Sequence, residues 1–276
     1  MPKFSANLSI LFTEHAFLDR FEAASRAGFK ATEFWFPYDW PVEDIASRLD
    51  RYSLKCLAIN TPPGDMALGE WGVGIFPSRK QEFEAGVRLA INYAVALHCE
   101  AIHVMAGIVP SAGNCSANGR GGLDDEDFSS TYVRNIAYAC RLAKAARLAV
   151  LIEPLNPFDR PGYYLQTMAQ AHDIVASIGE SNLLIMMDLY HVQMTEGNVT
   201  EKLRRYLPQI GHIQIADVPG RHEPGTGELN YDFILREIDR LQYGGWVGCE
   251  YGPLETSASS LGWAKPYARV NLPQRE

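Results

Sequence analysis

The segment AVLIEPLN at residues 149–156 is a short apolar run that ends on a glutamate followed by a proline. An apolar run without alternation is typical of a parallel strand that is buried on both faces. Seven further segments of similar length recur along the chain, and longer amphipathic stretches separate them. This alternation predicts repeated βα units. The eight predicted strands are residues 6–11, 31–36, 54–60, 101–105, 149–153, 183–188, 212–216 and 246–250.

Eight units in 276 residues average about 34 residues each, which is close to the length that one βα unit needs. We therefore predict a single (β/α)8 TIM barrel, an α/β fold, as one domain over residues 1–276. The alternative is an open doubly wound sheet, which usually has a glycine-rich phosphate turn after its first strand. The sequence LFTE follows at residues 11–14 instead. Gly28, Gly179 and Gly211 are expected where helices end.

The composition argues against several classes of partner. The chain has 25 Lys and Arg against 33 Asp and Glu, a net charge of -8, and lacks the basic run that nucleic acid or an anionic membrane would need. We find neither a signal peptide nor an apolar stretch of about 20 residues. Five cysteines without a C-x-x-C pair are typical of free thiols in a reducing cytosol. These features predict a cytoplasmic protein, and leave open whether it forms a homo-oligomer.

Four successive predicted strands end on an oxygen-bearing side chain, namely Glu153, Asp188, Gln214 and Glu250. In a barrel, the carboxyl ends of the strands meet at one rim, where active sites lie. Any one of these residues alone could simply cap the following helix. Three carboxylates at an apolar mouth, however, would repel one another unless a cation or a proton compensated them. The set therefore predicts a divalent metal, and its oxygen donors favour Mg²⁺ or Mn²⁺ over zinc.

Two polar residues near these strand ends are predicted to bind substrate. His191 lies three residues after Asp188, and Arg221 lies in the turn-rich segment 217–228. A guanidinium at the mouth of the barrel would bind a substrate carboxylate. The alternative for Arg221 is a surface ion pair with Glu223 or Glu228.

The remaining histidines carry weaker signals. His98, His172 and His212 are expected to be structural or exposed, because each precedes a strand end or falls in a helical pattern. His103 falls within a strand and could face either the barrel interior or the helices.

Two long connections are also predicted. Residues 61–79 follow the third strand and carry Trp71, so we interpret them as a lid candidate. The glycine-rich residues 113–122 are predicted to form a mobile loop rather than a phosphate site.

Several of these segments resemble the hydroxypyruvate isomerase family, a branch of the xylose-isomerase-like barrels. The similarity runs from the first predicted strand to the last, and its longest match is highly specific. It is carried by SANLS (5–9), FPYD (36–39), LIEPLN (151–156), MDLYHVQ (187–193), GHIQIADVPGRHEPGTGELNY (211–231) and GWVGCEY (245–251).

The resemblance implies an isomerase that interconverts hydroxypyruvate and tartronate semialdehyde, so the expected partner is a small hydroxy-oxo acid. It implies that Glu153 and Glu250 transfer the proton, and that Glu153, Asp188, Gln214 and Glu250 bind the metal. In the related ketose 3-epimerases a histidine takes the place of Gln214, which weakens an epimerase function here. A sister group isomerises 2-oxo-tetronates. INTPPGD (59–65) favours hydroxypyruvate, whereas HVMAGIVP (103–110) and EWG (70–72) resemble the tetronate branch. We predict hydroxypyruvate.

Two functions of other classes stay open at this point. A metal-dependent hydrolase acting on phosphodiesters or DNA would need further histidine ligands, zinc and a basic face, and the oxygen ligands and acidic charge argue against it. A sugar-acid sensor without catalytic activity would not need two glutamates beside a metal.

Overall fold

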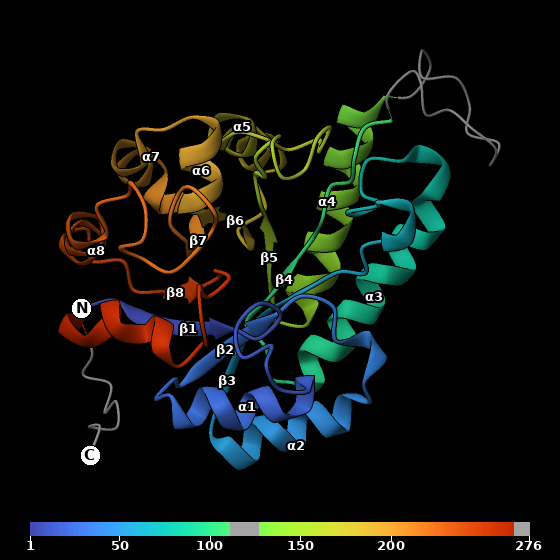
Figure 1. Cartoon of the computed structure of the whole chain (residues 1–276). Coiled ribbons are helices and arrows are strands. Elements are labelled where there is room, and N and C mark those ends of the chain that lie inside the picture. Colours follow the sequence, from blue (N-terminus) through green and yellow to red (C-terminus); the bar gives the residue numbers. More distant parts are fainter. Residues whose placement is uncertain (111–126, 268–276) are drawn as a thin grey trace.

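The computed structural model describes residues 1–110 and 127–267. Its eight parallel strands close into a barrel in sequence order, with β8 hydrogen-bonded to β1 and the helices outside (Figure 1). The predicted (β/α)8 barrel is thus confirmed, and the open sheet is wrong. The strands are β1 Lys3–Asn7, β2 Ala31–Phe34, β3 Lys55–Asn60, β4 Ala101–His103, β5 Ala149–Ile152, β6 Leu183–Asp188, β7 Ile210–Ile215 and β8 Trp246–Cys249.

The helices that cover the barrel begin and end on local signals. Thr167 caps α5 by accepting a hydrogen bond from the backbone N–H of Gln170, and Gly179 ends the same helix in the left-handed conformation. Gly28, which follows α1, also has a positive φ. The helices are α1 Phe17–Arg26, α2 Val42–Tyr52, α3 Lys80–Ala96, α4 Phe128–Ala145, α5 Met168–Ile178, α6 Leu189–Thr195, α7 Val199–Tyr206 and α8 Tyr231–Arg240.

Gly211 does not end a helix as expected, because it lies inside β7. A Cβ atom at this position would lie 2.8 Å from the side chain of Leu184 on the neighbouring strand. Close packing between strands therefore explains this glycine.

The first strand is displaced from its predicted position at residues 6–11. β1 ends at Asn7, and the apolar residues Leu8 and Leu11 lie in the turn that follows. Both leucines are fully buried, and the N–H of Leu11 donates to the carbonyl of Asn7. Their hydrophobicity thus reflects burial in a turn and not strand structure.

The barrel interior changes from apolar to polar along the strands. Ala58, Ala101, Leu151 and Met186 form a small buried cluster inside the barrel. Side chains two residues apart on a strand share a face, so each strand then presents a polar residue above the cluster. These polar residues are Asn60, His103, Glu153 and Asp188. The apolar cluster therefore lies directly beneath the polar residues at the carboxyl end of the barrel.

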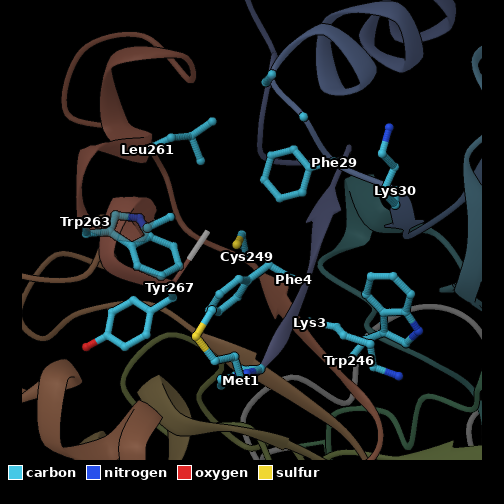
Figure 2. Close-up of a pocket in the computed structure, with 14 residues that line it drawn as sticks. Met1, Lys3, Phe4, Phe29, Lys30, Trp246, Cys249, Leu261, Trp263 and Tyr267 are labelled. Carbon is cyan, nitrogen blue, oxygen red and sulfur yellow. The ribbon is translucent and has the colours of Figure 1, made fainter. Parts of the chain in front are cut away.

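A cavity of about 280 Å³ lies at the end of the barrel where the strands begin, opposite the polar residues just described. Aromatic side chains dominate its wall, and Phe4 and Trp263 pack edge to face across it at 5.1 Å (Figure 2). Lys3 and Lys30 contribute charged side chains to the part of its lining that the structure describes. This cavity is remote from the carboxylates at the strand ends.

Within the described ranges, no helix is long and apolar enough to cross a membrane. The predicted loop at residues 113–122, with Cys115, lies outside those ranges. Four further cysteines are buried free thiols: Cys56, Cys99, Cys140 and Cys249.

Candidate active site

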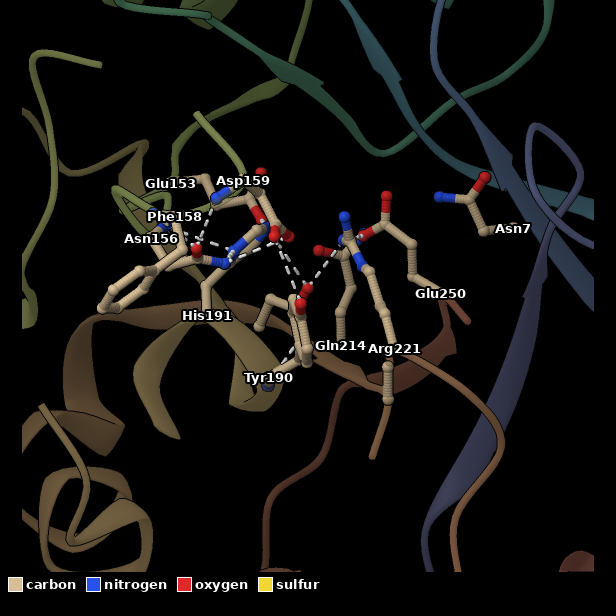
Figure 3. A network of polar contacts seen from close by, with 12 residues as sticks. Asn7, Glu153, Asn156, Phe158, Asp159, Tyr190, His191, Gln214, Arg221 and Glu250 are labelled. Atoms are coloured by element: carbon tan, nitrogen blue, oxygen red, sulfur yellow. Dashed lines mark hydrogen bonds and ion pairs between the residues drawn. The ribbon is translucent and has the colours of Figure 1, made fainter. Parts of the chain in front are cut away.

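The four residues predicted at the strand ends are all buried at the carboxyl end of the barrel. Glu153, Asp188, Gln214 and Glu250 are each exposed by 6% or less. Glu153 and Glu250 line a cavity together with His191 and Arg221, and Figure 3 shows these four side chains with Gln214. Asp188 contacts Arg221 and lies near His191. The barrel therefore brings together all six predicted site residues.

Three oxygen atoms in this group have no hydrogen-bond partner among the residues that the structure describes. They are Oε1 of Glu153, Oε1 of Gln214 and Oε2 of Glu250. Buried acceptors of this kind are costly unless a proton or a cation satisfies them. Carboxylate and amide oxygens are the ligands that a hard divalent cation prefers. The donor set thus fits such an ion.

The pKa values of the three carboxyl groups are raised, as expected for buried acids that lie close together. Burial, followed by the charges of Glu250 and Asp188, raises the pKa of Glu153 well above its ordinary value. Burial raises the pKa of Glu250 to about 8, although the charge of Arg221 opposes this shift. Burial also raises the pKa of Asp188, against the opposing charge of Arg221. Without a cation, this site would retain protons at neutral pH.

His191 lies close enough to Glu153 and Asp188 for the three side chains to hold a metal ion. Its Nε2 is 3.7 Å from Oδ2 of Asp188 and 4.0 Å from Oε1 of Glu153. Its Nδ1 accepts the backbone N–H of Asn156 at 3.3 Å and lies 2.6 Å from the side-chain Nδ2 of Asn156.

These contacts determine which ring nitrogen of His191 carries the proton. The side-chain Oδ1 of Asn156 accepts the backbone N–H groups of Phe158 and Asp159, so its Nδ2 is the group that faces His191. Nδ1 of His191 therefore acts as an acceptor, and the ring proton is on Nε2. Burial keeps the pKa of His191 well below its ordinary value, so the ring is neutral. A protonated Nε2 donates a hydrogen bond and does not bind a metal ion, which favours the substrate-binding role over ligation.

Arg221 points into the site. Its Nη2 donates to Oδ2 of Asp188 at 2.9 Å and lies 3.5 Å from Oε2 of Glu250. The alternative surface pair with Glu223 or Glu228 is wrong: Glu223 accepts the N–H of Leu254, and Glu228 accepts from Gln193.

The loop that carries Arg221 is organised around one carboxylate. Asp217 is fully buried and accepts backbone N–H groups from Gly225, Gly227 and Leu229. These bonds fix the turn-rich segment that places the guanidinium over the carboxylates.

A further glutamate, which was not predicted from the sequence, lies beneath the site. Glu33 is buried on β2, and its carboxylate lies 2.7 Å from Nε2 of His212. Glu33 also accepts a hydrogen bond from Nε2 of Gln214 at 2.8 Å, so the amide oxygen of Gln214 is the atom left without a hydrogen-bond partner among the described residues. Burial raises the pKa of Glu33, but the charge and hydrogen bond of His212, together with hydrogen bonds from Gln214 and Ser5, hold this pKa below the ordinary value. A glutamate within the apolar strand ATEFW was the available signal.

His212 is structural, as expected, since it is buried as the partner of Glu33. His103, whose orientation was open, faces the barrel interior with its Nδ1 3.7 Å from Oε2 of Glu153. Burial lowers the pKa of His103 to about 3, so this ring is neutral.

Aromatic residues that the sequence analysis did not assign close the cavity. The indole N–H of Trp35 donates to Oε1 of Glu250 at 2.7 Å. Trp71, from the predicted lid segment, packs edge to face with Trp35 at 6.1 Å and also lines the cavity. The segment 61–79 thus supplies part of the wall.

Comparison with known proteins agrees with this architecture. A family model described as xylose isomerase-like TIM barrel matches residues 21–267. The chain is 44% identical to a 2-oxo-tetronate isomerase from Cupriavidus necator, over 97% of this chain and 99% of that protein. It is 42% identical to hydroxypyruvate isomerase from Escherichia coli, over 97% of this chain and all of that protein.

One solved structure is similar at the level of both fold and sequence. It is described as an AP endonuclease, family 2, from Brucella melitensis, with a TM-score of 0.90, 40% identity, and coverage of 97% of this chain and 99% of that chain. Structures of sugar epimerases, such as D-psicose 3-epimerase from Clostridium cellulolyticum, share the fold at 15% identity. The chain therefore belongs to the xylose isomerase-like TIM barrel family, in the branch that contains hydroxypyruvate isomerase and the 2-oxo-tetronate isomerases.

Proposed function

We propose that this isomerase interconverts hydroxypyruvate and tartronate semialdehyde by proton transfer between adjacent carbons. The observation that carries the proposal is the pairing of Glu153 and Glu250, two buried glutamates of raised pKa that line one cavity. Raised values suit carboxyl groups that take up and return protons near neutral pH. The relatives named above support this class of reaction.

The reaction needs one base, one acid and stabilisation of negative charge. A proton leaves C3 of hydroxypyruvate, and the electron pair forms the C2–C3 double bond of an enediolate. A proton is then added at C2, while the proton of the C3 hydroxyl moves to the C2 oxygen and the carbonyl forms at C3. The atoms therefore balance without a redox partner. Glu153 and Glu250 stand on β-strand ends from different sides of the barrel, which supports one of them acting as the base and the other as the acid.

The remaining site residues would stabilise the charge on the substrate oxygens. His191 offers a neutral Nε2–H donor, and Arg221 offers a guanidinium beside Glu250 and Asp188. Glu153, Asp188, Gln214 and Glu250 would hold a divalent ion, Mg²⁺ or Mn²⁺ by their donor chemistry. Such an ion supplies Lewis-acid stabilisation of developing negative charge when it is bound.

The second candidate is a 2-oxo-tetronate isomerase, because relatives with that name are 44% and 41% identical to this chain. Its chemistry is the same proton transfer on an acid that is one carbon longer. A side-by-side assay of hydroxypyruvate and 2-oxo-tetronates, with and without a chelator, separates the two substrates.

Replacing either glutamate tests the mechanism. Glu153→Gln and Glu250→Gln are each expected to abolish isomerisation and the exchange of solvent deuterium into substrate. Glu180→Gln is the control, because Glu180 pairs with Lys144 outside the cavity. Full activity of either cavity variant would overturn the assignment.

A further inference from the structure

The cavity contains one cationic side chain that the reaction described above does not use. Arg160 lies in the connection between β5 and α5 and lines the same cavity as Glu153 and Glu250. Its guanidinium carbon is 3.7 Å from the ring centre of Trp71, a short cation–π contact. Two loops that are far apart in sequence thus hold this charge at the cavity.

Arg160 forms no ion pair in the described part of the chain. Its side chain donates a hydrogen bond from Nη1 to the backbone carbonyl of Asp159, and no described carboxylate lies within 4.0 Å of it. Arg221, by contrast, already contacts Asp188 and Glu250. The two arginines therefore differ: Arg221 forms ion pairs with Asp188 and Glu250, whereas Arg160 forms none with the described residues.

The surroundings of Arg160 disfavour a lone positive charge. The side chain is partly buried, and burial and the charge of Arg221 lower its pKa from the ordinary value, although the charge of Asp159 opposes this shift. Two cations at one cavity repel each other, and an anion placed between or beside them relieves that repulsion. A guanidinium with free N–H donors is suited to bind a carboxylate through two hydrogen bonds.

We propose that Arg160, held against Trp71, binds the carboxylate of the substrate and so orients its reacting carbons toward Glu153 and Glu250. This inference rests on the proposed function, since it assigns the acid end of that substrate. It also gives the two arginines different roles. Arg160 binds the carboxylate, which is the role that the sequence suggested for Arg221, and Arg221 contacts the oxygens of the reacting carbons. A neutral sugar would leave Arg160 unpaired, so the residue would select acids over neutral compounds.

The test uses Arg160→Met, which keeps an unbranched apolar stem over Trp71 but removes the charge. We expect KM for the acid substrate to rise about 10- to 100-fold with a smaller change in kcat, as for the loss of a charge-assisted hydrogen bond. Arg160→Lys should recover part of this loss. Arg205→Met is the matched control, because Arg205 also lies over a ring, that of Tyr206 at 5.2 Å, but outside the cavity.

A binding experiment separates recognition of the carboxylate from a structural role. Pyruvate carries a carboxylate where hydroxyacetone carries a neutral hydroxymethyl group. Calorimetry measures the Kd of each compound. Arg160→Met should weaken pyruvate binding about 10- to 100-fold and leave hydroxyacetone binding unchanged. Equal weakening of both, or of neither, would overturn the proposal.

The same measurements distinguish this inference from the proposed function. If the wild-type protein isomerises neither hydroxypyruvate nor a 2-oxo-tetronate, the proposed function fails, and the pyruvate and hydroxyacetone comparison still tests Arg160. If the wild-type protein is active and Arg160→Met keeps the wild-type KM, the assignment of Arg160 alone fails. Trp71→Leu provides a second variant, with an expected rise of KM of about 3- to 30-fold from the lost cation–π contact.

Discussion

The side-chain amide of Asn156 lies 2.6 Å from Nδ1 of His191 and leaves the ring proton on Nε2, the nitrogen that faces the carboxylates. The backbone N–H of Asn156 points at the same Nδ1. One residue thus sets the tautomer of the histidine in the cavity (Figure 3). Groups that orient a functional histidine commonly affect activity as strongly as direct contacts do.

Asn156→Asp is expected to change this tautomer without removing the turn, because a carboxylate oxygen can still accept the N–H groups of Phe158 and Asp159. The new carboxylate would favour a proton on Nδ1 of His191. We expect kcat to fall about 10- to 100-fold. Nitrogen-15 NMR of the ring reports the tautomer directly. A wild-type spectrum together with wild-type kcat in this variant would contradict the role of Asn156.

Removing one partner of the buried Glu33 and His212 pair should destabilise the barrel. The remaining charge would stay buried without compensation, so His212→Leu is expected to lower the free energy of unfolding by about 3–5 kcal/mol. Urea denaturation measures the difference. Replacing His172, which is half-buried on α5 beside Gln209, is the comparison and should cost less.

The same pair predicts how stability depends on pH. Glu33 has a lowered pKa in the folded protein, so its contribution is present above its unfolded pKa and is lost as pH falls through the folded pKa. His212 has a raised pKa, because the charge and hydrogen bond of Glu33 outweigh burial, and its contribution is lost as pH rises through the folded pKa. The pair should therefore stabilise most between about pH 4.5 and 6.5. Comparing unfolding of wild type and His212→Leu across pH 4 to 9 checks this window.

Gly248 leaves the space that the Glu33 carboxylate occupies. A Cβ atom on Gly248 would lie 2.5 Å from Oε1 of Glu33, so alanine there must displace the carboxylate that orients Gln214. We expect Gly248→Ala to cost about 1–3 kcal/mol of stability and to reduce activity. Gly244→Ala is the matched control, because a Cβ atom there meets no described atom within 4 Å. Equal effects of the two substitutions would contradict this explanation.

Binding of a divalent ion should release protons. Burial raises the pKa of Glu250 to about 8 and that of Glu153 well above its ordinary value, so both carboxyl groups tend to be protonated at neutral pH without an ion. A cation requires the charged form, and Mn²⁺ affinity should therefore increase as pH rises toward about 8. Calorimetry in two buffers of different ionisation enthalpy counts the protons. Affinity that does not change with pH, or with Glu250→Gln, would contradict the proposed ligand set.

The local sequence was sufficient for the architecture and for much of the site. Apolar runs of strand length recur at the spacing of βα units, and the carboxyl ends of parallel strands must meet, so Glu153, Asp188 and Glu250 could be assigned to one rim. Hydrophobicity alone predicted the ends of the strands less well. Leu8 and Leu11 were assigned to the first strand, but they are buried in the turn that follows β1. Gly211 was misread because close contact between strands leaves the same signal as a helix end.

Contacts between residues far apart in sequence were decided by the tertiary structure alone. Glu33 and His212 are separated by 179 positions, and Trp35 and Glu250 by 215, so no local pattern relates them. The orientation of the Gln214 amide and the stacking of Arg160 on Trp71 depend on which loops the closed barrel brings together. The sequence by itself determined which chemical groups the barrel carries at its mouth, because strand periodicity is local. Only closure of the barrel determined their partners, protons and orientation, because those depend on neighbours across the interior.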